Sequence, residues 1–260
     1  PRRGGTPPAS SSRRAPAGPR RLSVIIPAFN EEKLLPRTLE SLRASLAAFT
    51  NAGWETEVIV CDNNSADRTA EVARAHGARV VFEPHNQIAR ARNTGAAAAT
   101  GGWLLFLDAD CEPSRELLAA LEARLRRGGV LYGGAVVALD RPPGLFAAFV
   151  AGWNFLSRTL RWMAGSFVCV EAAAFREVGG FSPRMYAGEE IDLSRRLKPL
   201  CRAQGKRAFI LSRHPLRTSA RKLRLYSAGE LLRFFLRAVL RPWKTVRSRE
   251  ACSIWYDGRR

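Results

Sequence analysis

Long hydrophobic runs are missing from this chain of 260 residues. Its most apolar stretch, 145–170, is interrupted by Asn154, Arg158 and Arg161. It therefore falls short of the roughly 20 consecutive apolar residues that a transmembrane helix needs. Residues 1–21 also lack the apolar core of a secretory signal. We expect no membrane span and a cytoplasmic location.

Paired cysteines and glycine-rich loops are absent as well. The five cysteines are odd in number, and none of them forms a C-x-x-C pair, which argues against a zinc site and a disulfide framework. Such cysteine usage fits a reducing compartment. No G-x-G-x-x-G follows the first apolar strand, which excludes a dinucleotide oxidoreductase.

Acidic residues are scarce, with 23 Asp and Glu against 42 Lys and Arg and a net charge of +19. The excess lies at the two ends of the chain and predicts an anionic partner, such as phospholipid, nucleic acid or nucleotide phosphate. Residues 1–21, rich in Pro, Ser, Gly and Arg, are predicted to be a disordered basic tail.

Residues 219–260 are predicted to form a basic helical extension. Its helix over 228–244 is amphipathic, with arginines interleaved among large apolar residues. This pattern predicts salt-sensitive, peripheral contact with an anionic membrane, on its inner face. Packing of the helix against the preceding domain explains the pattern equally well.

Between the two basic ends, apolar strands alternate with amphipathic helices. Strands are expected at 22–27, 57–61, 79–82, 103–107, 130–139, 167–170 and 207–211. Helices are expected at 31–48, 66–76 after a Ser65 cap, 86–100, 114–126, 145–164, 171–178 and 188–200. The alternation predicts one α/β domain over 22–218.

The apolar run 103–107 ends abruptly at Asp108-Ala109-Asp110. A run of this kind is typical of a central strand that is buried on both faces. Carboxylates at the end of such a strand lie where open α/β sheets bind ligands, and two of them suit Mg²⁺ or Mn²⁺ holding a diphosphate. Alternatively, Asp110 caps the helix that follows.

Four stretches occur together in order: VIIPAFNEE (24–32), VIVCDNNSADRT (58–69), RARN (90–93) leading to LDAD (107–110), and GEEIDL (188–193). This series resembles the family 2 glycosyltransferases over about 22–218. The resemblance implies the GT-A fold, a single Rossmann-like, mostly parallel sheet flanked by helices. It implies a catalytic domain over 22–218, with a nucleotide-binding half at 22–127 and an acceptor-binding half at 128–218. It also implies inverting transfer of a sugar from a nucleotide-diphosphate sugar to a hydroxyl acceptor, with the DXD motif binding a metal.

The resemblance also implies roles for individual residues. Arg92 would face the diphosphate and Asp62 with Asn63 would meet the base, although the family usually has a second Asp in place of Asn63. The nucleotide-binding set is Pro27, Ala28, Phe29, Glu31, Asp62, Asn63, Arg92, Asp108 and Ala109.

The catalytic and metal residues follow from the same resemblance. Glu190 would be the general base, with Glu189 as the alternative because Glu190 is one methylene longer than the usual Asp. Asp110, Asp108 and His214 would be the ligands of Mg²⁺ or Mn²⁺. Asp192 is expected instead to pair with a neighbouring arginine one helical turn away.

Two other functions fit part of the pattern. A nucleotidyltransferase on a related scaffold would need a metal and basic phosphate contacts, but a glycine-rich basic loop is missing after the first strand. A non-catalytic basic protein that binds nucleotides or nucleic acid would explain the charge, but no nucleic-acid module is present. We expect a UDP-sugar rather than a GDP-sugar donor, no nucleic-acid partner, and a saccharide or lipid-linked acceptor, the latter because 153–180 is apolar and aromatic.

Overall fold

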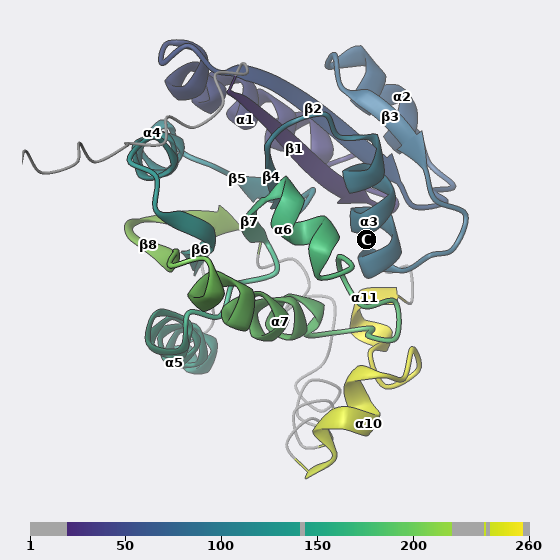
Figure 1. The fold of residues 1–260 in the computed structure, drawn as a ribbon. Coiled ribbons are helices and arrows are strands. Elements are labelled where there is room, and N and C mark those ends of the chain that lie inside the picture. The colour runs from purple at the N-terminus through teal and green to yellow at the C-terminus, as the bar shows by residue number, and fades with distance from the viewer. Residues whose placement is uncertain (1–19, 141–143, 220–236, 238–239, 257–260) are drawn as a thin grey trace, which may run out of the picture.

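The computed structural model describes residues 20–140, 144–219, 237 and 240–256 (Figure 1). Up to residue 126 the elements are β1 (Arg21–Ala28), α1 (Leu35–Thr50), β2 (Glu55–Asp62), α2 (Thr69–Ala75), β3 (Arg79–Phe82), α3 (Ile88–Ala98), β4 (Trp103–Leu107), β5 (Cys111–Glu112) and α4 (Arg115–Arg126). They continue as β6 (Val130–Leu139), α5 (Gly144–Leu160), β7 (Phe167–Glu171), α6 (Ala172–Glu177), α7 (Glu189–Ala203), β8 (Arg207–Thr218), α10 (Pro242–Val246) and α11 (Ser253–Tyr256).

A single sheet, eight-stranded within the described residues, has the order β3-β2-β1-β4-β7-β6-β8-β5. Strands β3, β2, β1 and β4 pair in parallel, and so do β6 and β8. Strand β7 runs antiparallel to both of its neighbours, β4 and β6. The prediction of one α/β sheet flanked by helices is therefore confirmed, and the direction of β7 makes the second half of the sheet mixed.

Helices cover both faces of the sheet (Figure 1). The buried side chains of α1 and α4 belong to one hydrophobic cluster, and those of α3, α6 and α7 belong to another on the opposite face. Strand β4 separates the two clusters, because Leu105 and Leu107 point into the first whereas Leu104 and Phe106 point into the second. The apolar run before Asp108 is thus a central strand buried on both faces, as predicted.

Three sequence-based boundaries were wrong. The first helix begins at Leu35 rather than at residue 31, because the carbonyl of Glu31 accepts the amides of Leu34 and Leu35 in a preceding turn. Ser65 does not cap α2, since its hydroxyl accepts the amide of Asn30 and the helix begins at Thr69. The strand predicted at 207–211 is β8, which extends to Thr218 because it pairs along β6 and with β5.

The predicted tail and carboxyl-terminal helix fall largely outside the described residues. Of 1–21 only Arg20 and Arg21 are described, and Arg21 already belongs to β1. Of 228–244 the structure describes 237 and 240–244, where Arg241 has non-helical torsions (φ −140°, ψ 61°) and α10 begins at Pro242. Proline disfavours helical torsions in the residue before it, so the predicted helix is broken there. No helix within the described ranges is both long and apolar enough to cross a bilayer.

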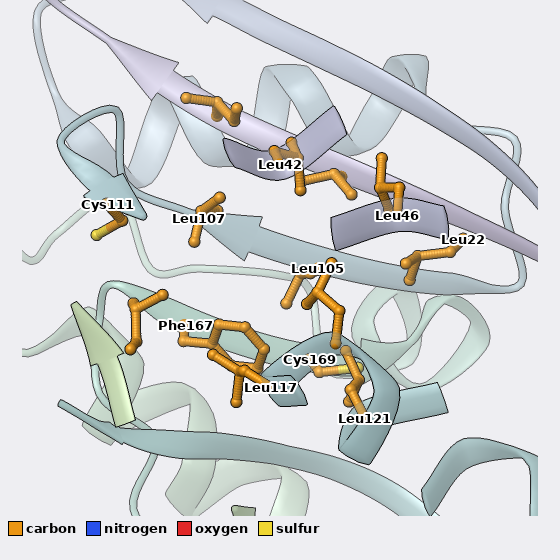
Figure 2. Packing of buried hydrophobic residues seen from close by; sticks show 14 of the residues in the cluster. Leu22, Leu42, Leu46, Leu105, Leu107, Cys111, Leu117, Leu121, Phe167 and Cys169 are labelled. Carbon is orange, nitrogen blue, oxygen red and sulfur yellow. The ribbon is translucent and has the colours of Figure 1, made fainter. Parts of the chain in front are cut away.

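Leu105 tests the packing between β4 and the α1/α4 face of the sheet. It lies among Phe167, Cys169 and Leu121 in Figure 2, and it is fully buried. Leu105→Ala should lower the free energy of unfolding by about 2–5 kcal/mol, because the cavity it leaves cannot fully collapse. Urea denaturation measures this change. Leu240→Ala is the control, since Leu240 is 76% exposed. Equal, small effects of the two substitutions would contradict the assigned core.

Candidate functional site

The carboxyl ends of β1, β2 and β4 meet at one edge of the sheet. The parallel register places Ala28 beside Asp62, and Ile25 beside Phe106 two residues before Asp108. Such an edge is where open α/β sheets bind ligands. A cavity of about 150 Å³ lies there, lined by Pro27, Ala28, Phe29, Glu31, Asn63, Asn86, Ile88, Arg92, Asp108, Ala109, Asp110, Gly165, Tyr186, Ala187, Gly188, Glu189, Glu190 and Tyr256.

The structure brings nearly all of the residues expected from the sequence to this cavity. Asp62 is not part of the lining, because its carboxylate accepts the amide of Ser65 (3.1 Å) inside the turn after β2. His214 is also outside the lining and lies in β8. There it acts electrostatically on Glu116 in the first turn of α4, whose pKa is lowered mainly by local hydrogen bonds.

Asn63 lines the cavity, but its side chain is largely occupied within the protein. The amide nitrogen donates to the carbonyls of Glu83 (3.1 Å) and His85 (2.7 Å). The amide oxygen accepts the backbone N–H of Gln87 (2.9 Å). Both amide donors are therefore used, and Asn63 is only 3% exposed. In this structure the side chain fixes the loop that leads into α3.

Arg92 on α3 lies under the cavity and binds two carboxylates. Its guanidinium donates to Glu189 (2.7 Å), to Asp108 (2.9 Å) and to the carbonyl of Gly165 (2.7 Å). One face of the guanidinium lies over the ring of Phe181, at 5.2 Å from the centroid. Burial alone would lower the pKa of Arg92, but the carboxylates, Asp108 first, raise it above its usual value. The guanidinium of Arg92 is thus bound by two carboxylates of the protein itself.

Glu189 and Glu190 begin α7 and have different environments. Gly188 precedes them in the left-handed conformation (φ 70°), which a residue without a Cβ adopts readily. Glu189 is buried against Arg92, whereas Glu190 is only partly buried and borders Gly165. Burial and the charge of Glu189 raise the pKa of Glu190 to about 8. Of the pair, Glu189 is thus engaged in an ion pair with Arg92, whereas Glu190 lines the cavity with its protonated form favoured.

Two carboxylates, Asp108 and Asp110, face the cavity at the end of β4. Asp108 gives one oxygen to Arg92, and its side chain remains 33% exposed. Asp110 also borders a second cavity of about 420 Å³ near the amino-terminal end of α1. Helix α4 is capped by Ser114, whose hydroxyl accepts the amide of Leu117, so Asp110 is not needed as a cap. Nowhere in the described parts of the chain do three His, Cys, Asp or Glu side chains form a metal-binding group.

Other residues at the cavity were not singled out by sequence reasoning. They are Asn86, Ile88, Gly165, Tyr186, Ala187, Gly188 and Tyr256. Tyr256 comes from α11, 68 positions after Gly188, and no local pattern in the sequence marks it. Asp192, by contrast, pairs with Arg196 one turn along α7 (2.7 Å), which confirms the expected structural role.

Arg92 should be required for stability. Arg92→Met leaves Glu189 and Asp108 without their buried cation, and breaking such a pair costs about 3–5 kcal/mol. The deficit should be larger at pH 8 than at pH 5, because protonation relieves unpaired carboxylates. Chemical denaturation at both pH values measures it. Arg90→Met is the matched control, since Arg90 is exposed on the same helix. A loss no larger than that of the control would show that the ion pairs do not stabilise the fold.

The sequence of this chain is similar to those of known proteins. The family model described as "Glycosyl transferase family 2" matches residues 23–175. The pre-mycofactocin glycosyltransferase of Mycobacterium tuberculosis is 31% identical over 202 residues, which cover 71% of this chain and 41% of the relative. The chain thus spans about two fifths of the length of that curated relative.

Solved structures share the fold at low sequence identity. A mannosyltransferase from Pyrobaculum calidifontis in complex with GDP-Man and Mn²⁺ superimposes with a TM-score of 0.63 at 21% identity, covering 92% of this chain and 66% of that one. The glucosyl-3-phosphoglycerate synthase of Mycobacterium tuberculosis, in complex with Mn²⁺, UDP and glucosyl-3-phosphoglycerate, gives 0.59 at 22%, covering 90% and 80%. On the family match, the sequence relative and the shared fold together, the chain belongs to glycosyl transferase family 2.

Proposed function

We propose that this protein is an inverting glycosyltransferase that moves a sugar from a nucleotide-diphosphate sugar, UDP- in preference to GDP-, to a hydroxyl acceptor. The observation that carries the proposal is the meeting of Asp108, Asp110 and Glu190 around one cavity at the carboxyl edge of the sheet. The first two follow the end of β4, and the third lies at the start of α7.

The residues present fit a divalent cation. Mg²⁺ and Mn²⁺ suit carboxylate oxygens, and Mg²⁺ in particular is usually held by one or two carboxylates, with water and substrate phosphates completing the shell. Asp110, with the exposed part of Asp108, offers that donor set. His214 is not needed for such a site, and its place in β8 gives it no part in the cavity lining. A bound cation would neutralise charge on the departing nucleotide.

Glu190 is proposed as the general base. The oxygen of the acceptor hydroxyl forms a bond to the anomeric carbon, and its proton passes to the Glu190 carboxylate. The bond between the anomeric carbon and the diphosphate oxygen breaks, and the nucleoside diphosphate leaves with the electron pair. Gly165 borders the Glu190 carboxylate, since a Cβ there would lie in van der Waals contact with it at 3.4 Å.

Glu189 and Arg92 are proposed as positioning residues. The ion pair at 2.7 Å keeps Glu189 away from the proton transfer and fixes the start of α7. The same guanidinium holds Asp108, so the two halves of the site cannot move apart without breaking a buried ion pair. This ion-pair network would keep the base, Glu190, at a fixed distance from the metal ligands after β4.

Asp110 provides the test of the metal site. Asp110→Asn should weaken Mn²⁺-dependent binding of UDP by about a hundredfold, because a neutral amide replaces a charged ligand. Isothermal titration with and without Mn²⁺ measures it, and thermal unfolding checks the fold. Glu112→Gln serves as the control, since Glu112 pairs with Arg37 at 2.7 Å outside the donor cavity. UDP binding that is equally strong in Asp110→Asn would remove the residue from the metal site.

Glu190 provides the test of the base. Glu190→Gln should keep donor binding and lower turnover by about 10²–10⁴-fold. In the wild type, kcat/KM should rise with pH up to about 8 and then level off, because the carboxyl group must lose its proton before it can accept one. A pH–rate series on hydrolysis or transfer of the donor sugar measures both effects. An active Glu190→Gln beside an inactive Glu189→Gln would reverse the two assignments.

A further inference from the structure

Helix α5 lies at the edge of the fold and is held to the sheet by its polar side chains (Figure 1). The Asn154 amide accepts the N–H of Val137 in β6 (3.0 Å) and donates to the carbonyl of the same residue (2.8 Å). Strand β7 pairs with β6 only at 132–134, so Asn154 satisfies the backbone of β6 beyond that point. Ser157 is fully buried, and its hydroxyl donates to the carbonyl of Trp162 (2.6 Å). The polar groups of α5 are therefore used on its inner side.

The outer face of α5 is apolar. Phe155 is 63% exposed and its neighbour Leu156 is 39% exposed. Three small residues, Ala148, Ala151 and Gly152, are exposed at helical spacing before them. Single exposed apolar residues are ordinary, whereas a continuous apolar stripe on a helix is typical of a surface that binds an apolar partner.

The charge around this face is positive. Residues 141–170 contain three arginines and no Asp or Glu. Two of the arginines, Arg158 near the end of α5 and Arg161 directly after it, are exposed. A second copy of the chain, which also carries a net charge of +19, would bring like charges together at this face. An anionic surface would attract them instead, so the charge favours an anionic lipid surface over a second copy.

The length of α5 suits a helix that lies on a membrane. It has 17 residues, interrupted by Asn154 and Arg158, and so falls short of a span. A helix with one apolar face can instead lie in the plane of the interface. Four residues, 161–164, join α5 to Gly165, which lines the donor cavity. Five extended residues reach about 18 Å, so a surface bound by the end of α5 lies near the cavity.

We propose that the outer face of α5 docks on an anionic lipid surface. Phe155 and Leu156 enter the boundary between headgroups and acyl chains, and Arg158 and Arg161 contact lipid phosphates. The small side chains earlier in the helix let its backbone approach the surface closely. The inference goes beyond the proposed transfer reaction and uses no residue of the donor cavity. It also differs from the contact expected for 228–244, because it rests on a helix that the structure describes.

Binding of the full chain to lipid vesicles tests the inference by co-sedimentation. The wild type should bind vesicles of phosphatidylcholine mixed with phosphatidylglycerol, and added salt should weaken this binding because it screens the arginines. The double variant Phe155→Ser with Leu156→Ser should bind about tenfold more weakly, because less apolar surface leaves water. Arg158→Gln should bind the mixed vesicles about fivefold more weakly and show no such loss on pure phosphatidylcholine. Phe82→Ser is the matched control and should bind like the wild type, since Phe82 is 57% exposed on β3 at the opposite edge of the sheet.

The outcomes separate this inference from the proposed function. A wild type that ignores the mixed vesicles overturns it, and so does a double variant that binds them like the wild type or no more weakly than Phe82→Ser. A wild-type dimer that the double variant lacks in sedimentation velocity, without vesicle binding, would assign the face to a second copy instead. UDP binding with Mn²⁺ should be equal in the wild type and the double variant. If the double variant is misfolded by thermal unfolding, Arg158→Gln decides by its difference between the two kinds of vesicle. A wild type that binds vesicles but neither UDP nor GDP overturns the proposed function alone.

Discussion

The site depends on the buried charge of Arg92. A guanidinium that is 2% exposed can remain charged only with carboxylates beside it, and Glu189 and Asp108 provide them at 2.7 and 2.9 Å. These acids belong to different parts of the chain, the start of α7 and the end of β4. The arginine therefore links the end of β4, which is followed by Asp108 and Asp110, to the start of α7, which carries Glu189 and Glu190.

This arrangement divides the polar residues of the cavity into two kinds. One kind makes hydrogen bonds to other groups of the protein and fixes the shape of the cavity: Arg92, Glu189 and Asn63. Asp110 and Glu190 line the cavity. Burial and the charge of Glu189 raise the pKa of Glu190, and the positive charge of Arg92 only partly offsets them. A carboxyl group with a pKa of about 8 would suit the proton transfer proposed for Glu190.

The second half of the chain contributes through its topology. Strand β7 enters antiparallel between β4 and β6, and the turn before it brings Gly165 to both Arg92 and Glu190. Helix α11 lies beside the start of α3 (Figure 1). The cavity is thus formed by segments that lie far apart in the sequence and meet only in the folded chain.

The sequence by itself determined the alternation of strands and helices, the buried strand before Asp108, and the membership of Asp108, Asp110, Glu189 and Glu190 in one site. The first two features are local, because hydrophobic periodicity records them directly. The common site of the four acids was implied by the resemblance of their motifs to the family 2 glycosyltransferases. Only the tertiary structure decided that Arg92 binds carboxylates and that Asn63 supports a loop. It also decided that His214 lies in β8, away from the cavity lining, and that Tyr256 reaches the cavity. Each of these depends on a partner that is distant in sequence, and a residue's type and spacing do not specify which distant group satisfies it.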